Sequence, residues 1–418
     1  MAARGWLTAL GALQVEVEPA AVGLDAGRLG RIDEFLQATL AAGRIPGWVL
    51  AVSRSEQLVH VSTAGARDIE TGRPAEPDTL FRIYSMTKPI TAVAAMILYE
   101  RGAFELSDPV ARFIPSFADM RVFVGGSDLR PVTQPAIRPI TMWHLLAHTA
   151  GLTYGFHRAH PVDALYRQAG HEIEAPDGTL AESCETWARL PLLFQPGAEW
   201  NYSVATDVVG RVVEVISGQS LGEFCDQNIF DPLGMTDTAF TVADSDADRL
   251  ARLYLATPAG GLEPGDKLGA TVRKPDRAHY GGGGLVSTAG DYLRFATMLL
   301  DRGELGAVRI LGPRTVDFMT RNHLPDGVDL AQFGRPMNAE SPLAGVGQGL
   351  GLSVVLDPVR AGFLTSPGEF GWGGAASTVF WVDPELELVV VFMTQVLPAV
   401  ALPIRNLLHQ LVHQAVLD

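Results

Sequence analysis

The chain has 418 residues, of which 47% are hydrophobic and 19% charged, with a net charge of −15. This is a globular composition with ample material for a core. The negative charge argues against nucleic acid or an anionic membrane as the partner, and no apolar run approaches the roughly 20 residues of a membrane span.

The N-terminal segment carries one basic residue and a short apolar run, and Gln14, Glu16 and Glu18 follow without a small-x-small cleavage site. A signal peptide needs such a site, so we expect a cytoplasmic protein. Cys184 and Cys225 are the two cysteines. We expect them to be free thiols, because two cysteines define neither a disulfide framework nor a metal site.

Hydrophobic periodicity predicts the first elements of the chain. Apolar residues near a 3.6-residue period predict a helix over 24–42. The segments 48–53 and 58–62 are predicted as strands of a hairpin. The Ala-rich stretch 89–99, followed by Gly102, predicts a buried helix.

From about 141 to 300 the pattern is mostly helical, and it changes to strands in the last quarter. The expected elements are helices at 205–217 and 291–300, strands at 351–356, 377–382 and 386–393, and a closing helix at 406–416. Because strands lie at both ends, they can join in one antiparallel sheet. We therefore expect an α+β fold with a discontinuous sheet domain, 1–84 with 285–418, and an inserted helical domain, 85–284.

The main chemical signal is Ser85-Met86-Thr87-Lys88. Residues three apart on a helical turn share a face, so the hydroxyl and the amine can meet. A lysine can accept the proton of a serine when burial lowers its pKa, whereas an arginine stays charged. The chain has 29 arginines and three lysines. An ordinary surface charge at position 88 would therefore more often be an arginine than a lysine. A Ser-x-x-Lys pair still arises by chance in about one chain of this composition in eight.

Two further segments could complete such a site. Tyr202 could relay a proton between the nucleophile and the leaving group. The stretch 371–375, Gly-Trp-Gly-Gly-Ala, is expected to open a late strand. Its glycines would let a substrate approach the backbone, and a free N–H there could help to hold an oxyanion.

Taken together, these motifs resemble a known family. Ser-x-x-Lys, Tyr-Ser-x and Trp-Gly-Gly, in this order and spacing, are similar to family VIII carboxylesterases, the serine esterases related to class C β-lactamases and D-Ala-D-Ala carboxypeptidases. The resemblance covers about residues 25–395, and three supporting stretches match it: 145–152, 232–235 and 282–288. It implies a β-lactamase/transpeptidase-like fold, with the active site in the cleft between the two domains.

The resemblance also implies a role for each matching residue. Ser85 would be the acylated nucleophile, with Lys88 and Tyr202 as base and proton relay. The backbone N–H groups of Ser85 and Ala375 would form the oxyanion hole. The substrate would be bound by Tyr154, Trp372, Gly373 and Gly374.

Two departures from the β-lactamase pattern suggest a neutral substrate. Where those enzymes usually have Tyr-x-Asn, the third position here is Val204, which cannot hydrogen-bond a substrate amide. Where they usually have a cation on the late strand, this chain has Trp372. Both changes remove groups that would bind an acidic peptide or a lactam.

Three other motifs are interpreted as structural. Ser220 lies in Gly-x-Ser-x-Gly, but it follows a helix rather than the strand that a nucleophile elbow needs. His144 and His148 lack the glutamate and the third ligand of a zinc site. The glycines at 281–284 are expected to form a close backbone turn beside the pocket.

The sequence thus predicts a carboxylesterase that hydrolyses neutral esters of short to medium acyl chains through an acyl-enzyme, without a metal or organic cofactor. The alternatives are acyl transfer to an alcohol, β-lactam hydrolysis and a catalytically silent scaffold. The expected partner is a small-molecule ester, and the oligomeric state stays open.

Overall fold

The structure is a computed structural model that describes residues 13–172, 177–265, 267–274, 276–335 and 343–417. Within these ranges no helix is both long and apolar enough to cross a bilayer. The N-terminal segment on which the cytoplasmic prediction rests lies largely outside the described residues, and that prediction stays open. Both cysteines are free and buried, as predicted.

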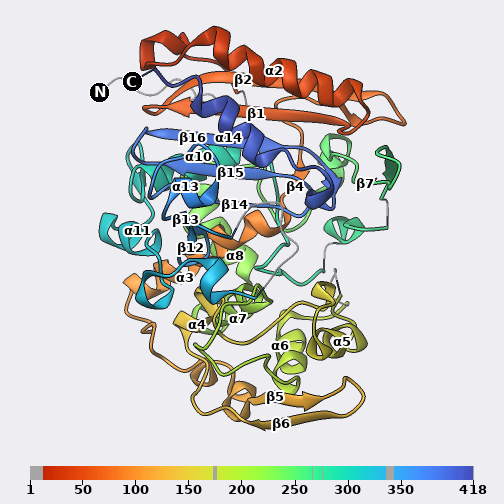
Figure 1. Ribbon diagram of the computed structural model, residues 1–418, viewed down its shortest axis with the longest axis vertical. Coiled ribbons are helices and arrows are strands. Elements are labelled where there is room, and N and C mark those ends of the chain that lie inside the picture. Colours follow the sequence, from red (N-terminus) through yellow and green to blue (C-terminus); the bar gives the residue numbers. More distant parts are fainter. Residues whose placement is uncertain (1–12, 173–176, 266, 275, 336–342, 418) are drawn as a thin grey trace.

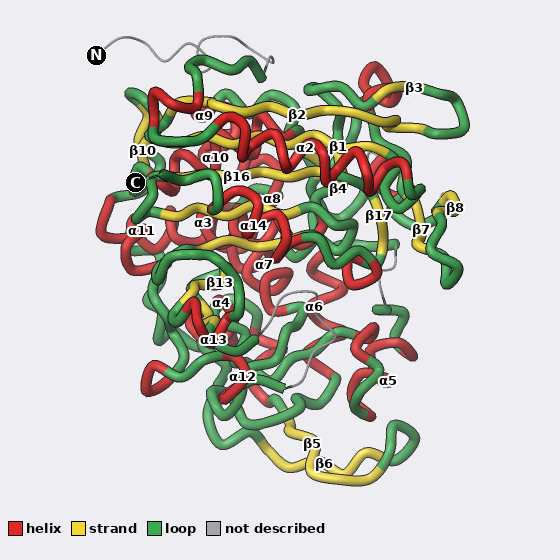
Figure 2. Tube along the Cα trace, turned by 45° about the horizontal axis from the view of Figure 1, so that its top comes forward, coloured by secondary structure: helices red, strands yellow, loops and turns green. Residues whose placement is uncertain are grey.

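An eight-stranded antiparallel sheet forms the centre of the fold (Figures 1 and 2). In spatial order its strands are β12 (Val346–Gln348), β13 (Ser353–Val355), β14 (Phe370–Gly373), β15 (Val379–Asp383), β16 (Leu388–Met393), β1 (Gly47–Arg54), β2 (Gln57–Asp68) and β3 (Arg73–Pro74). The pairing of β1 with β16 joins the two ends of the chain. The predicted single sheet with strands from both ends is confirmed.

The side chains of β1 alternate between two hydrophobic cores. Val49 and Ala51 point into the larger core, which also contains the helix after Ser85. Trp48, Leu50 and Val52 point into the smaller core on the other face of the sheet. Because successive side chains of a strand point to opposite faces, a strand covered on both sides is apolar throughout.

Helices cover both faces of this sheet. Helix α2 (Ala26–Ala41) and helix α14 (Arg405–His413), from opposite ends of the chain, pack together on one face (Figure 1). Helix α10 (Ala289–Leu300) packs on β15, β16 and β1 from the other side. Asp25 caps α2 by accepting the N–H of Arg28, and this bond satisfies one of the free donors at the helix start.

In Figure 1 residues 120–190 lie on the side of the molecule away from α2, whereas Asp248 and Arg252 hydrogen-bond to Arg67 of β2. The middle of the chain is mostly helical. Its helices are α3 (Thr87–Glu100), α4 (Met142–Leu146), α5 (Pro161–Gln168), α6 (Leu180–Arg189), α7 (Ala205–Ser217), α8 (Leu221–Cys225) and α9 (Asp231–Leu233). The hairpin β5 (Arg121–Gly126) and β6 (Pro131–Pro135) accompanies them. Helices α3 and α7 pack together, and they carry Lys88 and Asp207.

The remaining elements are short and lie around these layers. They are β4 (Phe81–Arg82) with β9 (Val286–Ser287), β7 (Tyr254–Ala256) with β8 (Leu262–Pro264) and β17 (Val396–Leu397), β10 (Glu304–Leu305) with β11 (Val308–Arg309), and the helices α11 (Pro313–Met319), α12 (Leu330–Phe333) and α13 (Pro358–Ala361).

The predicted elements are present, with ends shifted by a few residues. The predicted helices correspond to α2, α3, α7, α10 and α14, and the predicted strands to β1, β2, β13, β15 and β16. One expectation is wrong: the stretch 371–375 does not open a strand but ends β14 and turns towards β15. Alternating glycines have a low strand propensity, which hid β14 from the sequence pattern.

We propose the division into 1–84 with 285–418 and 85–284, because every described strand of the eight-stranded sheet comes from the first part.

Candidate active site

Ser85 lies in a short 3₁₀ turn, Tyr84–Met86, that leads directly into α3. Tyr84, the residue before it, has a φ of 43°, in the left-handed region that residues other than glycine rarely occupy. Such backbone strain persists only where surrounding structure holds it, and it is common at active sites. The turn places Ser85 in the wall of a cavity.

Lys88 is in the first turn of α3 and is only 1% exposed. Its Nζ atom lies 3.3 Å from Ser85 Oγ and donates to the carbonyl oxygen of Gly282 at 2.6 Å. The three-residue spacing thus brings amine and hydroxyl together, as the sequence predicts. Lys88 is not part of the cavity wall: it lies behind Ser85, out of direct contact with solvent.

Tyr202 approaches Ser85 from the segment before α7. Its hydroxyl donates to Ser85 Oγ at 2.6 Å, and its ring lies 4.5 Å from Lys88 Nζ. His157 Nε2 donates to the backbone oxygen of Tyr202 at 2.7 Å and so helps to hold the segment in place. Burial lowers the pKa of His157, which favours its neutral form.

Asp207, in the first turn of α7, connects the glycine stretch to the site. Its Oδ1 accepts the N–H of Gly282 at 2.7 Å. The carbonyl oxygen of the same glycine accepts the hydrogen bond from Lys88. Burial raises the pKa of Asp207 to about 6, while the charge of Lys88 and the Gly282 N–H act in the opposite direction. A Cβ on Gly282 would collide with the Asp207 carboxylate, so only glycine fits there.

Aromatic side chains surround the serine. The ring of Tyr154 lies 5.2 Å from that of Tyr202 and stacks on Phe156 at 4.7 Å. The indole of Trp372 lies 5.7 Å from the Tyr202 ring. Burial raises the pKa of Tyr154 far above its usual range, and the nearby Asp207 carboxylate acts in the same direction. Tyr154 is therefore a neutral phenol in this site.

The end of β14 forms the opposite wall. Strand β13 pairs with β14 only at Phe370 and Gly371, so among the described residues the far edge of β14 has no strand partner at Trp372 and Gly373. The Gly374 N–H donates to Thr378 O at 2.8 Å. Ala375 is exposed at the tip of the following turn.

One cavity of ≈ 1160 Å³ brings these parts together. Its wall includes every predicted site residue except Lys88: Ser85, Tyr154, Tyr202, Trp372, Gly373, Gly374 and Ala375. The sequence-predicted residues therefore lie in one place. The individual roles that the resemblance implies for them stay predictions.

The motifs interpreted as structural have structural contacts. Ser220 caps α8, where it accepts the N–H of Glu223, after Gly218 has ended α7 in a left-handed conformation. His144 accepts the N–H of Thr141 at the start of α4. The glycines at 282–284 line the cavity, as expected of a close turn beside it.

Three contributors to the site were missed from the sequence. Asp207 accepts the N–H of Gly282, and His157 donates to the backbone oxygen of Tyr202. The ring of His148 lies 5.1 Å from that of Tyr202. Burial, followed by the charge of Lys88, lowers the pKa of His148 well below its usual range. The only signal for Asp207 is a carboxylate in a helix that is otherwise largely apolar, five residues after Tyr202.

The antiparallel sheet with a helical insertion, and a serine in the cavity wall that is contacted by a buried lysine and by a tyrosine, define a serine hydrolase. Comparison with known proteins agrees, because residues 32–414 match the beta-lactamase family. The chain belongs to this family, and within its superfamily to the family VIII esterases.

Individual relatives cover most of the chain. It is 38% identical to an uncharacterized protein of Mycobacterium tuberculosis, over 85% of this chain and 87% of the relative. It is 33% identical to Esterase EstB of Burkholderia gladioli, over 90% and 93%. The solved structure of EstCE1, a hydrolase with promiscuous acyltransferase activity, superposes with a TM-score of 0.77 at 28% identity, covering 94% of this chain and 99% of EstCE1. The chain is therefore an esterase or an acyltransferase.

Proposed function

We propose that the protein is a carboxylesterase that hydrolyses neutral esters through an acyl-enzyme on Ser85. The observation that carries this proposal is the convergence on Ser85 Oγ of the Tyr202 hydroxyl, at 2.6 Å, and Lys88 Nζ, at 3.3 Å. A serine hydroxyl becomes a good nucleophile when a neighbouring group takes its proton. The name of Esterase EstB supports the same reaction class.

In the first step Ser85 Oγ attacks the ester carbonyl carbon, and its proton passes to Lys88 or Tyr202. The backbone N–H groups of Ser85 and Ala375 hold the oxyanion that develops on the carbonyl oxygen. The C–O bond to the alcohol breaks, and the alcohol leaves with the proton. Water then attacks the acyl-enzyme by the same route, and the carboxylic acid and free Ser85 result.

The wall of the cavity favours an uncharged substrate. Val204 offers no hydrogen bond to an amide, and Trp372 places an indole beside the site. The guanidinium groups of Arg82 and Arg405, which also line the cavity, donate to backbone carbonyl oxygens. A substrate carboxylate buried against Val204 and Trp372 would gain no cation from them and would lose its hydration uncompensated.

The assignment of the nucleophile is tested with two serine variants. Ser85→Ala should abolish hydrolysis of p-nitrophenyl butyrate and labelling by a fluorophosphonate. Ser220→Ala removes a helix cap, worth about 1 kcal/mol of stability, and should leave kcat/KM close to the wild-type value. A fluorophosphonate adduct on Ser220, with full labelling retained in Ser85→Ala, would reverse the assignment.

Acyl transfer to an alcohol is the second candidate function. A cavity of ≈ 1160 Å³ exceeds the volume of about 300–1000 Å³ that is usual for a site holding one small molecule. An alcohol acceptor could therefore bind beside the acyl group. EstCE1 is named as a hydrolase with promiscuous acyltransferase activity.

The two functions are distinguished by their products. With p-nitrophenyl butyrate and a primary alcohol such as 1-hexanol, a hydrolase yields mainly butyric acid, whereas a transferase yields mainly the hexyl ester. We expect acid as the main product and a minor ester fraction that disappears in Ser85→Ala. Ester as the main product at millimolar alcohol would make transfer the principal function.

A further inference from the structure

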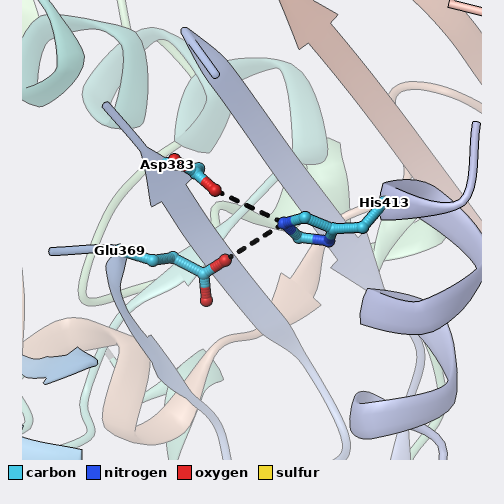
Figure 3. A group of neighbouring side chains, drawn as sticks. All are labelled: Glu369, Asp383 and His413. Atoms are coloured by element: carbon cyan, nitrogen blue, oxygen red, sulfur yellow. Dashed lines mark hydrogen bonds and ion pairs between the residues drawn. The ribbon is translucent and has the colours of Figure 1, made fainter. Parts of the chain in front are cut away.

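A second group of chemically reactive side chains lies on the face of the sheet that α14 covers. Glu369 directly precedes β14, Asp383 ends β15 and His413 ends α14. The exposed fractions of their side chains are 4%, 0% and 7%. Figure 3 shows that the His413 imidazole points between the two carboxylates. The proposed ester hydrolysis uses none of the three.

The distances in this cluster are long for ion pairs. His413 Nε2 lies 3.4 Å from Asp383 Oδ2 and 3.5 Å from Glu369 Oε2. A charge-assisted hydrogen bond is normally about 2.7–2.9 Å long. Two ligand atoms of a tetrahedral ion, each about 2.0–2.1 Å from the metal, are about 3.3–3.4 Å apart. The two nitrogen–oxygen distances are close to this spacing, and all three ligand atoms lie within 4.8 Å of one another.

The other nitrogen of His413 settles which atom faces the carboxylates. Nδ1 lies 2.9 Å from the backbone oxygen of His409, an atom that can only accept a hydrogen bond. Nδ1 therefore carries a proton. Burial opposes a charge on the ring, but the hydrogen bond to Asp383 and the charge of Glu369 raise the pKa of His413, so without a metal Nε2 is protonated too. A bound ion would displace that second proton. Metal-binding histidines almost always have this arrangement, with the second ring nitrogen donating to a carbonyl or a carboxylate.

The carboxylates are held in position, but one oxygen lacks a hydrogen bond. Asp383 Oδ1 accepts the N–H groups of Glu385 and Leu386. Glu369 Oε1 contacts His409 Nε2 at 3.0 Å. Glu369 Oε2 is buried and accepts no hydrogen bond from any described residue. An unsatisfied buried carboxylate oxygen is costly, and a cation would remove this cost.

We propose that Glu369, Asp383 and His413 bind one divalent transition-metal ion, with zinc as the best fit. One imidazole nitrogen and two carboxylate oxygens are ligands that zinc accepts at tetrahedral distances, and water would complete the shell. The ion would tie α14 to β14 and β15. Because β14 carries Trp372 and Gly373, the metal would support this part of the wall of the active site.

The test uses the purified full-length chain after dialysis against EDTA. Zinc is added in competition with a chromophoric chelator, and bound metal is measured after gel filtration by mass spectrometry. We expect one zinc per wild-type chain and a rise in Tm on zinc addition. Glu369→Gln and His413→Ala should each weaken binding by at least about tenfold, since outer-shell losses alone cost about 10–100-fold.

A matched control is His60, which lies 3.3 Å from Asp33 and has no second carboxylate beside it among the described residues. His60→Ala should bind zinc as the wild type does. Two results would overturn the proposal: no zinc bound to the wild-type chain, which needs no variant to fold, or equal zinc affinity in wild type and Glu369→Gln. The first result would show that a proton alone bridges the cluster.

Discussion

The role proposed for Lys88 depends on the type of residue at that position. It is enclosed between Ser85, the Gly282 carbonyl and the rings of Tyr202 and Tyr154, which lie 4.5 and 5.3 Å from Nζ. A neutral amine there can take the proton of Ser85 and still donate to Gly282. The permanently charged guanidinium of arginine could donate to a carbonyl oxygen, but it could not take the proton.

We therefore expect Lys88→Arg to lower kcat/KM on p-nitrophenyl butyrate by at least about 10²-fold, the low end for loss of general base catalysis. The matched control is Lys267→Arg, because Lys267 is exposed and is not among the residues that line the cavity. That variant should keep the wild-type rate. A folded Lys88→Arg enzyme with near wild-type kcat would contradict the role of Lys88 as proton acceptor.

At the level of elements, two glycines adjust the end of β14 to its neighbours. A Cβ on Gly373 would collide with the guanidinium of Arg405, which comes from α14 and donates to the Gly374 carbonyl oxygen at 2.8 Å. A Cβ on Gly374 would collide with the backbone oxygen of Ile83 and the hydroxyl of Thr378. Because Ile83 is two residues before Ser85, Gly374 sets how closely the turn after β14 approaches the nucleophile.

Gly374→Ala is therefore expected to push the turn with Ala375 away from Ser85. A displacement of about 1 Å at a catalytic group costs on the order of 10²-fold in rate, so we expect kcat to fall by about 10- to 100-fold. The fall should exceed any rise in KM, because the oxyanion contact is made in the transition state.

Gly30 is the control for this change, since it lies within α2 and a Cβ there meets no atom within 4 Å. Gly30→Ala should keep the activity and slightly raise the Tm, because alanine favours the helix more than glycine. Wild-type kcat in Gly374→Ala would mean that the turn after β14 takes no part in catalysis.

The whole molecule determines the substrate class, because the wall of the cavity comes from distant parts of the chain. Tyr154, Val204 and Trp372 are contributed by three separate segments, and none offers a charge to a carboxylate. A site without the polar partner of a substrate group discriminates strongly against that substrate. Neutral esters should therefore be preferred to β-lactams, although a very reactive lactam could still acylate Ser85.

The measurement is kcat/KM for p-nitrophenyl butyrate and for a chromogenic cephalosporin on the same preparation. We expect the ester to be preferred by at least about 10²-fold, a few kcal/mol for the unpaired groups. Equal or higher efficiency on the cephalosporin would contradict the esterase proposal. The Ser85→Ala variant corrects both rates for background hydrolysis.

The sequence by itself determined the local parts of this protein. The 3.6-residue period of α2 and α7 and the apolar runs of β1 and β16 depend on neighbouring residues, so these elements could be predicted. The pairing of Ser85 with Lys88 is local too, since three residues make one helical turn. Tyr202 and the Gly-Trp-Gly-Gly stretch could be assigned to the site only through the resemblance to a family.

Only the tertiary structure decided which distant residues meet. Asp207 reaches Gly282 across 75 positions, and Arg405 reaches Gly374 across 31. Glu369, Asp383 and His413 meet because β14 and β15 are neighbours in the sheet and α14 packs over them. These contacts depend on strand order and helix packing, which arise from burial of the whole core and leave no local pattern in the chain.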